Sequence, residues 1–385
     1  MKSNFPSTDA SFHIALFFCS LGGGGAERVM LNLASGFIQR GIKVDLVLGK
    51  AWGPHLQKVP SGVRLVDLKV SGVLATVFAL ASYLRREQPY VLISAMHYAN
   101  EIALWAKCIA KVPTRIVVTE HNILFHSLQH MTPTRKYLIP LFIKYFYPKA
   151  DRIVTVSQKA AEELAQFTGL PVERIQSIYN PVINSELLEK ARAPLEHPWF
   201  LPQEPPVILG VGKLEAQKDF PTLILAFAWV RKVRAARLAI LGWGPDQPKL
   251  QALIQELGLE EDVALLGYVD NPYAYMARAA VFVLSSAWEG LPTVLIEAMA
   301  VGTPVVSTDC SSGPAEILDN GKYGWLTPVG DSTALAKAIL AAIDSKHKEV
   351  DSSWLDQFSL ETATKQYLDL CDIPNQLDKS TQLSF

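Results

Sequence analysis

The sequence predicts an α/β protein with two doubly wound parallel sheets. Short, buried apolar runs alternate with amphipathic helical segments, and this alternation occurs once in each half of the chain. The proline-rich segment 194–206 interrupts the alternation and marks a linker between the halves. The chain has 385 residues, which is more than one hydrophobic core usually contains. We therefore expect two α/β domains that face a central cleft at the carboxyl ends of their strands.

The first half begins with a βαβ unit. Residues 12–19 form a continuous apolar run, residues 26–40 an amphipathic helix closed by Gly41, and residues 42–48 the next strand. Strands joined in this way run parallel and are buried on both faces. Residues 70–84 are apolar but shorter than the ~20 residues that span a bilayer, which favours a core helix. Further strands are predicted at 90–94, 115–119 and 152–157.

The second half repeats the alternation from its own start. Strands are predicted at 207–211, 237–241, 263–266, 281–284, 304–307 and 324–326. Residues 358–372 have the spacing of one more amphipathic helix, and a polar, loose tail follows it. The predicted domains are residues 1–193 and 194–357, followed by the helix and tail of residues 358–385.

Composition narrows the class of protein. A hydrophobic content of 49% describes a well-packed protein, and a net charge of -1 gives no reason to expect a nucleic-acid partner. The four cysteines are scattered, without the close spacing of a zinc or redox motif. We expect reduced thiols in a cytoplasmic protein. No spacing of His, Cys, Asp or Glu predicts a metal site.

The most informative motif is a pair of acids beside a strand-to-helix junction. Glu289 lies in the loop after the strand at 281–284, and Glu297 is expected in the first turn of the helix that starts at Thr293. The backbone N–H groups of such a junction favour bound anions. Carboxylates only accept hydrogen bonds, so they suit the hydroxyls of a sugar better than a phosphate. The junction predicts a ligand that carries both phosphate and sugar.

Two further loops fit a phosphate-bearing ligand. The glycines at 22–25 stand between the first strand and the first helix, where the backbone can approach a ligand closely. The alternative is a tight turn that needs glycine only for packing. Lys213 and Lys218 follow the first strand of the second half, where ligands of open sheets bind. The alternative for these two is a pair of solvated surface lysines.

Two features carry weaker signals. His121 comes directly after a strand of the first sheet and should face the cleft, where it can contact a sugar hydroxyl, unless it only packs in a loop. The segment from Arg135 to Lys149 mixes basic residues with aromatic and aliphatic ones. That mixture is typical of an interfacial membrane helix and also of an ordinary core helix.

Together these motifs resemble glycosyltransferase family 4, which has the GT-B fold of two Rossmann-like domains. The resemblance runs from Ile14 to about Tyr367, and its most specific parts are residues 289–300 and 302–306. The segments 26–28 and 311–317 add support. It implies that the terminal helix crosses back to the first domain.

The resemblance also implies a role for each candidate residue. Lys213 and Lys218 would bind the diphosphate of a nucleotide-sugar donor, Glu297 the ribose hydroxyls, and Glu289 the transferred sugar. The N–H groups of Gly290 and Leu291 would contact the donor, and Thr293 belongs to the same site. Gly24 and Gly25 would close over the phosphates, while His121 would reach the sugar. Two residues depart from the family pattern: Lys213 stands where many relatives carry arginine, and Pro292 lacks an N–H.

The activity that the resemblance implies is hexosyl transfer with retention, without a metal or other cofactor. UDP-sugars are the family's commonest donors. Our preferred acceptor is a polyprenyl-linked sugar or a lipid at the inner face of the membrane, with a soluble glycan as the alternative. Glu289 and His121 would orient the reactants while the acceptor attacks on the face that the diphosphate leaves. A sugar-nucleotide epimerase and a non-catalytic sugar-nucleotide-binding subunit remain alternatives, and a nicotinamide dehydrogenase is disfavoured because its fingerprint is absent.

Overall fold

The computed structural model describes residues 12–22, 24–121, 133–344 and 350–375. Its contacts divide the chain into two compact units. Unit 1 comprises Met1–Pro181 with Leu360–Phe385, and unit 2 comprises Val182–Ser359. Gly23 of the first glycine loop and the tail from Gln376, which we predicted to be loose, lie outside the described residues.

Unit 1 is built on a parallel sheet, which has seven strands within the described residues. Its strand order is β3-β2-β1-β4-β5-β6-β7. This order reverses at β1, as in a doubly wound sheet. The strands are β1 (His13–Phe18), β2 (Lys43–Leu48), β3 (Arg64–Asp67), β4 (Val91–Ala95), β5 (Arg115–Glu120), β6 (Arg152–Thr155) and β7 (Ile175–Ser177).

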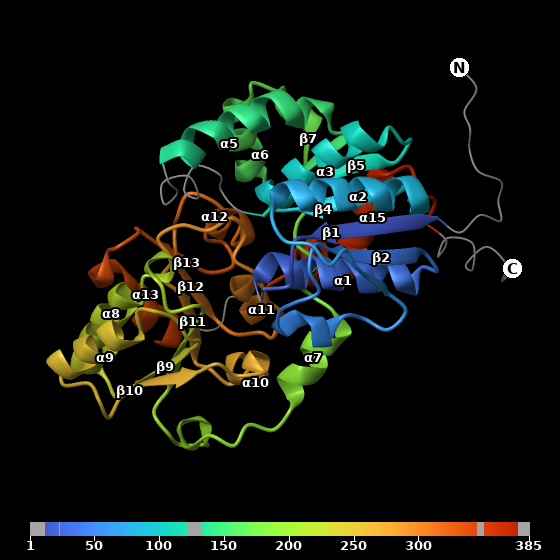
Figure 1. Ribbon diagram of the computed structural model, residues 1–385. Coiled ribbons are helices and arrows are strands. Elements are labelled where there is room, and N and C mark those ends of the chain that lie inside the picture. The colour runs from blue at the N-terminus through green and yellow to red at the C-terminus, as the bar shows by residue number, and fades with distance from the viewer. Residues whose placement is uncertain (1–11, 23, 122–132, 345–349, 376–385) are drawn as a thin grey trace, which may run out of the picture. The chain divides into compact units, whose positions relative to one another are not determined.

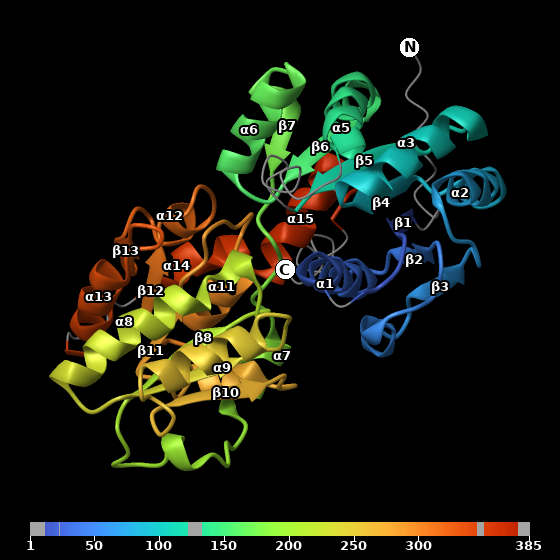
Figure 2. The same cartoon turned by 60° about the vertical axis from the view of Figure 1, so that its left-hand side comes forward.

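Helices cover both faces of this sheet (Figures 1 and 2). On one face α1 (Gly25–Gln39) and α15 (Leu360–Leu370) pack against the even-numbered side chains of β1, such as Leu16. The odd-numbered side chains of β1, such as Phe17, pack on the helices of the opposite face. Those helices are α2 (Val73–Glu87), α3 (His97–Ala110), α5 (Pro133–Phe146) and α6 (Gln158–Thr168).

The terminal helix α15 is held tightly against α1. A Cβ atom at Gly36 would lie 2.1 Å from Thr364 Oγ1, so no larger residue fits between the two helices there. Arg115 adds an ion pair to Asp372 at 2.7 Å. The helix expected at 358–372 therefore exists with slightly shorter bounds, and it belongs to unit 1 although 178 residues of unit 2 (182–359) precede it.

Two strands of unit 1 were not predicted, and both are short. Arg64–Asp67 at one edge carries half-exposed and exposed side chains, and Ile175–Ser177 has only three residues. The apolar pattern of a buried strand is absent from both. They are strands because β2 and β6 provide hydrogen-bonding partners for them.

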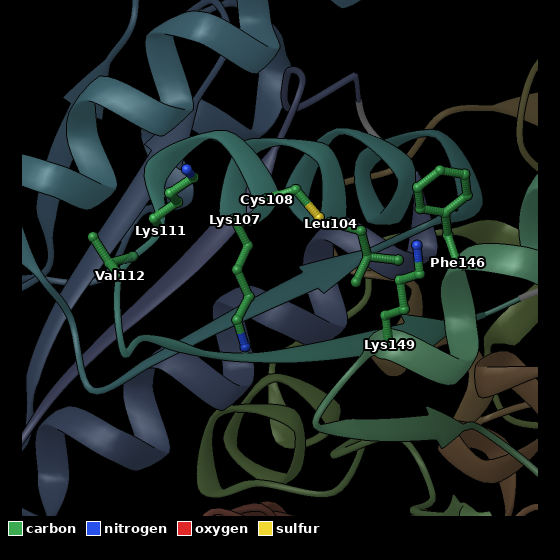
Figure 3. A pocket seen from close by; sticks show the side chains of 7 residues that line it. All are labelled: Leu104, Lys107, Cys108, Lys111, Val112, Phe146 and Lys149. Carbon is green, nitrogen blue, oxygen red and sulfur yellow. The ribbon is translucent and has the colours of Figure 1, made fainter.

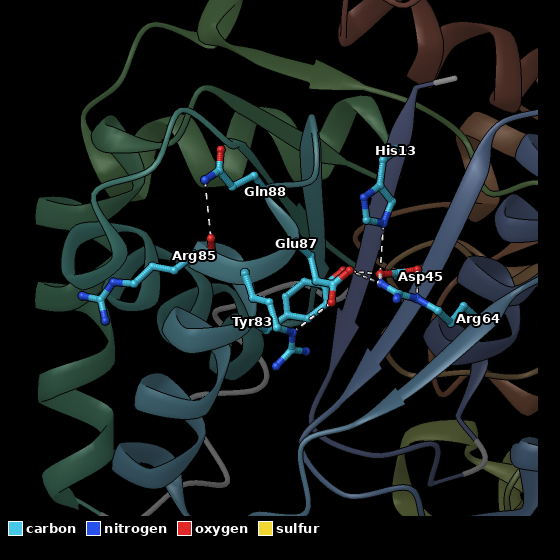
Figure 4. A network of polar contacts seen from close by, with 8 residues as sticks. His13, Asp45, Arg64, Tyr83, Arg85, Glu87 and Gln88 are labelled. Atoms are coloured by element: carbon cyan, nitrogen blue, oxygen red, sulfur yellow. Dashed lines mark hydrogen bonds and ion pairs between the residues drawn. The ribbon is translucent and has the colours of Figure 1, made fainter. Parts of the chain in front are cut away.

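A buried carboxylate ties β1, β2, β3 and α2 together (Figure 4). Asp45 of β2 is completely buried and accepts hydrogen bonds from Tyr83 at 2.6 Å and from Arg64 Nε at 2.8 Å. His13 Nε2 lies 2.9 Å from the same carboxylate. Burial alone would raise the pKa of Asp45, but the hydrogen bonds from His13, Arg64 and Tyr83 more than offset this and hold it below its usual value.

Unit 2 contains a second parallel sheet, with six strands among the residues described and the order β10-β9-β8-β11-β12-β13. On one face the core forms between strand residues such as Ile240 and Val283 and three helices, α8 (Phe220–Val233), α9 (Gln247–Glu256) and α13 (Ser332–Asp344). The strands are β8 (Val207–Val211), β9 (Arg237–Leu241), β10 (Val263–Gly267), β11 (Val281–Leu284), β12 (Val305–Thr308) and β13 (Trp325–Thr327). The helices are α7 (Ser185–Arg192), α8 (Phe220–Val233), α9 (Gln247–Glu256), α10 (Pro272–Met276), α11 (Thr293–Ala300), α12 (Pro314–Ile317), α13 (Ser332–Asp344) and α14 (Ser352–Leu355).

The division between the units falls earlier than the predicted boundary at 193/194. Residues 182–193 belong to unit 2, because α7 packs on α10 and Arg278 donates to the backbone of Ala191 and Ala193. The proline-rich segment 194–206 therefore lies within unit 2 and leads into β8. The packing of α7 on α10, rather than the break in composition, places this boundary before residue 182.

Candidate active site

In unit 2, two loops meet at the carboxyl end of the sheet. One follows β8 and ends in the 3₁₀ turn Ala216–Lys218, and the other follows β11 and leads into α11. Backbone and side-chain hydrogen bonds join them: Ala287 N–H donates to Gln217 O at 2.8 Å, and Ser285 Oγ donates to Lys218 O at 2.7 Å. The Gln217 amide also donates to Trp288 O at 3.0 Å. These bonds fix the two loops as one rigid element.

Lys218 and Glu289 form an ion pair between these loops. Lys218 Nζ lies 2.5 Å from Glu289 Oε1, and the two side chains are 16% and 7% exposed. Ser286 Oγ donates to the same oxygen at 2.6 Å, and Gln217 donates to the other oxygen at 3.4 Å. These three donors hold the Glu289 carboxylate in a fixed position. The sequence predicted both residues for the site but not their pairing.

Glycines create the space through which Lys218 reaches the acid. A Cβ atom at Gly212 would lie 3.1 Å from the aliphatic chain of Lys218, which runs along the bare backbone there. Gly242, at φ +134°, lets the end of β9 approach Gly212, since a Cβ atom would lie 1.8 Å from its carbonyl oxygen. Lys213 lies apart from this arrangement: it is 57% exposed and pairs with Glu215 at 2.7 Å.

The segment from Gly290 to Thr293 brings a helix N-terminus beside the ion pair. Gly290 and Leu291 are buried, and Thr293 is the first residue of α11. Ser312 Oγ donates to Gly290 O at 2.9 Å, so the loop after β12 supports this segment. The first N–H groups of a helix have no partner inside the helix, which makes its start favourable for an anion.

Glu297 differs from its predicted position. It is the fifth residue of α11, not part of the first turn, and its side chain is completely buried. Helix geometry explains the difference, because α11 starts at Thr293 and each turn takes 3.6 residues. Acidic side chains are rarely buried to this extent without polar partners, so Glu297 is not an ordinary solvated acid on a helix surface. Glu297 and Glu289 are thus both buried acids, one on α11 and one in the loop before it.

In unit 1, the glycine loop ends at the start of α1. Gly24 is the N-cap of α1, and its N–H donates to the carboxylate of Glu27, which is one of the two hydrogen bonds of a capping box; glycine has no side chain for the other. A Cβ atom at Gly24 would lie 2.7 Å from Glu27 Oε2, whereas a Cβ atom at Gly25 would meet nothing within 4 Å. Gly25 therefore has open space above it, and packing does not require glycine there.

His121 follows β5 and is 7% exposed. Its Nε2 atom lies 3.2 Å from Thr119 Oγ1, and the same hydroxyl donates its only proton to Ser94 O at 2.9 Å. The hydroxyl must then accept from His121, so Nε2 carries the imidazole proton and Nδ1 is a lone-pair acceptor. Within the described residues, Nδ1 is buried and has no hydrogen-bond partner. Burial lowers the pKa of His121 to about 4, so the ring is neutral at pH 7.

A buried acid that the sequence did not single out lies next to His121 in the chain. Glu120 accepts from Asn100 Nδ2 at 3.0 Å and from the hydroxyl of Tyr147. Burial raises the pKa of Glu120 to about 7, although both hydrogen bonds oppose the rise. His55, which was also not predicted, is buried near the glycine loop, and burial together with Lys58 lowers its pKa. Glu120 ends β5, and an acid at the carboxyl end of a buried strand is the signal that could have found it; His55 lies in the 3₁₀ turn Pro54–Lys58, where no such signal exists.

The segment from Arg135 to Lys149 forms most of α5 and the turn after it. The side chains of 133–138 lie outside the described part, and those of 139–149 are partly apolar and exposed: Leu141 is 53% and Tyr145 63% exposed. None of the described helices combines the length and the apolar character that crossing a bilayer requires. Among the described residues, no three His, Cys, Asp or Glu side chains are grouped as ligands for a metal.

Each half of the chain matches a family of known proteins. Residues 23–185 match the family described as Glycosyltransferase Family 4, and residues 193–353 match Glycosyl transferases group 1. The chain is 31% identical over 345 residues to N-acetylgalactosamine-N,N'-diacetylbacillosaminyl-diphospho-undecaprenol 4-alpha-N-acetylgalactosaminyltransferase of Campylobacter jejuni. That alignment covers 86% of this chain and 90% of the relative. The chain belongs to glycosyltransferase family 4.

Solved structures confirm the fold predicted for this glycosyltransferase. A glycosyltransferase from Rickettsia africae superposes with a TM-score of 0.78 at 15% identity, covering 94% of this chain and 98% of that one. Anabaena HepE in complex with UDP-glucose superposes with a TM-score of 0.70 at 22% identity, covering 97% and 100%. The GT-B prediction, with Rossmann-like α/β topology in both units, is therefore correct.

Proposed function

We propose that this glycosyltransferase transfers a hexosyl group from a UDP-sugar to a lipid-linked or glycan acceptor, with retention and without a bound metal. The observation that carries the proposal is the Lys218–Glu289 ion pair beside the N-terminus of α11. It combines a cation, the N-terminus of a helix and a fixed acid within two joined loops. A nucleotide-sugar needs all three, because it presents a diphosphate next to a polyhydroxyl ring.

The diphosphate would bind at Lys218 and the start of α11. The ammonium is only 16% exposed, so it is weakly screened by water and acts strongly on a nearby anion. It neutralises charge that develops on the departing diphosphate, a role otherwise filled by a metal ion. Lys213, exposed and paired with Glu215, would add charge only at the margin of this site.

The two buried acids would bind hydroxyls. Glu289 is held by three donors. A phosphate that draws Lys218 away would leave Ser286 as the donor to Oε1, and this oxygen could then also accept from the transferred sugar. Glu297 on α11 would accept from the ribose. In unit 1, His121 Nδ1 would accept a hydrogen bond from a sugar hydroxyl, and the open space at Gly25 would admit a phosphate.

In the proposed reaction, the acceptor hydroxyl attacks the anomeric carbon on the face from which the diphosphate leaves. The bond from that carbon to the phosphate oxygen breaks as the new glycosidic bond forms. The acceptor proton passes to the departing phosphate oxygen, so atoms and charge balance without an added base. Glu289 and His121 orient the hydroxyls and do not form a covalent intermediate.

A membrane-borne acceptor agrees with two observations. The Campylobacter relative is named for an undecaprenol-linked acceptor. The exposed apolar residues Leu141 and Tyr145 give α5 a surface that suits contact with a membrane. We propose that this part of the segment from Arg135 to Lys149 brings the enzyme to its acceptor.

The test is a donor screen that measures release of UDP, GDP or ADP from the corresponding sugars, with and without a chelator. We expect turnover with a UDP-sugar that survives chelation, and product in which the sugar is joined to a second molecule. Glu289→Ala and Lys218→Ala should each lose most of the activity, by about 10²-fold or more. Circular dichroism provides the control for folding.

Two results would contradict the proposal. Activity retained in both variants would refute the assignment of the site. Conversion of the donor to an epimer, with no second molecule attached, would refute transfer as the reaction.

A further inference from the structure

A pocket of about 270 Å³ lies in unit 1 between α3 and the end of α5 (Figure 3). Its apolar wall consists of Leu104, Val112 and Phe146. The remaining side chains at its edge are Lys107, Cys108, Lys111 and Lys149. Lysines thus make up three of the seven lining residues, and none of the seven is acidic.

The pocket has a net positive charge even though one of its lysines forms an ion pair with an aspartate beside it. Lys107 Nζ pairs with Asp151 at 2.6 Å, so three lysines minus one aspartate leave a net charge of +2. Lys149 Nζ lies 4.7 Å from the centre of the Phe146 ring, which holds the ammonium at the rim. Lys111 is exposed at the C-cap of α3.

The end of α3 would repel an anion if its last carbonyl groups were bare. Arg85 of α2 prevents this. Its guanidinium donates to Ile109 O at 2.5 Å and to Ala110 O at 3.4 Å. The carboxyl end of the helix is therefore covered by a cation, and the lysines determine the local potential.

Apolar side chains continue from the pocket to the surface. Phe146 stacks on Phe142 with ring centres 4.3 Å apart, and Trp105 lies 6.0 Å from Phe142. Trp105 is 38% exposed, and Leu141 and Tyr145 are more exposed still. A charged pocket next to exposed apolar side chains matches a ligand with an anionic head and an apolar tail.

We propose that this pocket binds the phosphate headgroup of an anionic phospholipid, with Trp105, Leu141 and Tyr145 in the acyl boundary. The proposal rests on the membrane-borne acceptor proposed above, and it gives the enzyme a lipid site distinct from its donor site. Vesicle binding needs neither donor nor acceptor, so failure here and failure of the proposed reaction are separate results.

The first experiment measures binding to vesicles of phosphatidylcholine, with and without phosphatidylglycerol, by co-sedimentation. The protein should bind the mixed vesicles, and the variant Lys111→Gln/Lys149→Gln should bind them about 25-fold more weakly, at about fivefold for each lysine. Lys249→Gln/Lys337→Gln is the matched control, because it removes two exposed lysines from unit 2. The control should bind like the wild type.

The second experiment uses Cys108 as a reporter of occupancy. It is the exposed cysteine of the four, whereas Cys310 and Cys371 are buried and Cys19 is half-buried with a pKa raised by burial to about 11. Mixed vesicles should slow the reaction of Cys108 with a thiol reagent about fivefold. Cys108→Ser supplies the background rate.

Three outcomes overturn the proposal. Equal binding by Lys111→Gln/Lys149→Gln and the wild type would show that the pocket is not used. An equal loss of vesicle binding in that variant and in the unit 2 control would show that only the net charge of the protein attracts it to the vesicles. Protection of Cys108 by inorganic phosphate but not by mixed vesicles would make the ligand a free phosphate.

Discussion

The candidate residues of unit 2 and those of unit 1 differ in their charge and in the groups that they offer to a ligand. In unit 2, Lys218 and Glu289 neutralise each other and are tied into two joined loops. In unit 1, the candidates carry no charge: Gly25 has open space above it, and His121 is a neutral ring with a buried acceptor atom. A ligand of unit 2 must break or replace the Lys218–Glu289 ion pair. A ligand of unit 1 can occupy the open space at Gly25 and donate a hydrogen bond to His121 Nδ1.

Because of this difference, substitutions in the two units should affect folding stability and turnover differently. Removing one member of a buried ion pair leaves a charge without compensation, so substitutions in unit 2 should cost both folding free energy and turnover. A substitution at an open position such as Gly25 removes no contact of the free protein. It should affect turnover alone.

The largest effect is expected at Lys218. Lys218→Met leaves the Glu289 carboxylate without its cation and should lower the free energy of unfolding by about 3 kcal/mol. Turnover should fall by about 10²- to 10³-fold, because in the proposed reaction Lys218 supplies the charge that stabilises the leaving diphosphate. Chemical denaturation and UDP release measure the two quantities.

The double variant Lys218→Met/Glu289→Gln sharpens this result. It removes both charges, so it should recover most of the lost stability but none of the activity. Recovery of activity together with stability would mean that the ion pair only supports the fold.

The second effect concerns Glu120 and pH. Its pKa is raised from 4.5 to about 7 in the folded protein, so the folded state binds more protons between these values. The contribution of Glu120 to the free energy of unfolding is fully present below pH 4.5 and is lost as the pH rises to about 7. Glu120→Gln cannot ionise, so its stability relative to the wild type should rise with pH by up to about 1.4 kcal/mol per unit in this window.

Denaturation with urea at several pH values measures this difference. His121 acts in the opposite direction, since its lowered pKa costs stability as pH falls below 6.5. Subtracting the wild-type curve from that of the variant cancels the His121 contribution. A difference that does not change with pH would show that Glu120 is ionised in the folded protein.

A third prediction concerns Thr119 as a positioning residue for His121. Thr119→Val removes the acceptor of the Nε2 proton, and turnover should fall about tenfold as the ring loses its fixed tautomer. Thr119→Ser keeps the hydroxyl and should therefore keep the turnover of the wild type. ¹⁵N NMR of the imidazole reads the tautomer directly, and an Nδ1–H form in the wild type would contradict the assignment.

The smallest effect is expected from Gly25→Ala. The added methyl group meets nothing within 4 Å, so the melting temperature should not change. KM for the donor should rise several-fold if a phosphate approaches this backbone. Gly24→Ala is the comparison, because its methyl group displaces Glu27 and should also weaken the cap of α1, by up to about 1 kcal/mol. An unchanged KM in Gly25→Ala would remove this glycine from the site.

Much of the fold followed from local patterns. The strands at Val207–Val211, Arg237–Leu241 and Val281–Leu284 have their predicted bounds, because buried parallel strands are continuous apolar runs between turn residues. Glu289 was correctly placed in a loop for the same reason. The strands Arg64–Asp67 and Ile175–Ser177 could not be found in this way, since their neighbours rather than their own side chains make them strands.

The sequence by itself determined the two strand–helix alternations, the family and the residues that line the strand ends. Only the tertiary structure decided how those residues interact. Lys218 pairs with Glu289, which lies 71 positions further along the chain, and Asn100 of α3 donates to Glu120 of β5 and to Tyr147. The physical reason is the range of the forces. Hydrophobic periodicity acts between near neighbours in the chain, whereas ion pairs, tautomers and buried carboxylates depend on which atoms the fold brings within about 3 Å.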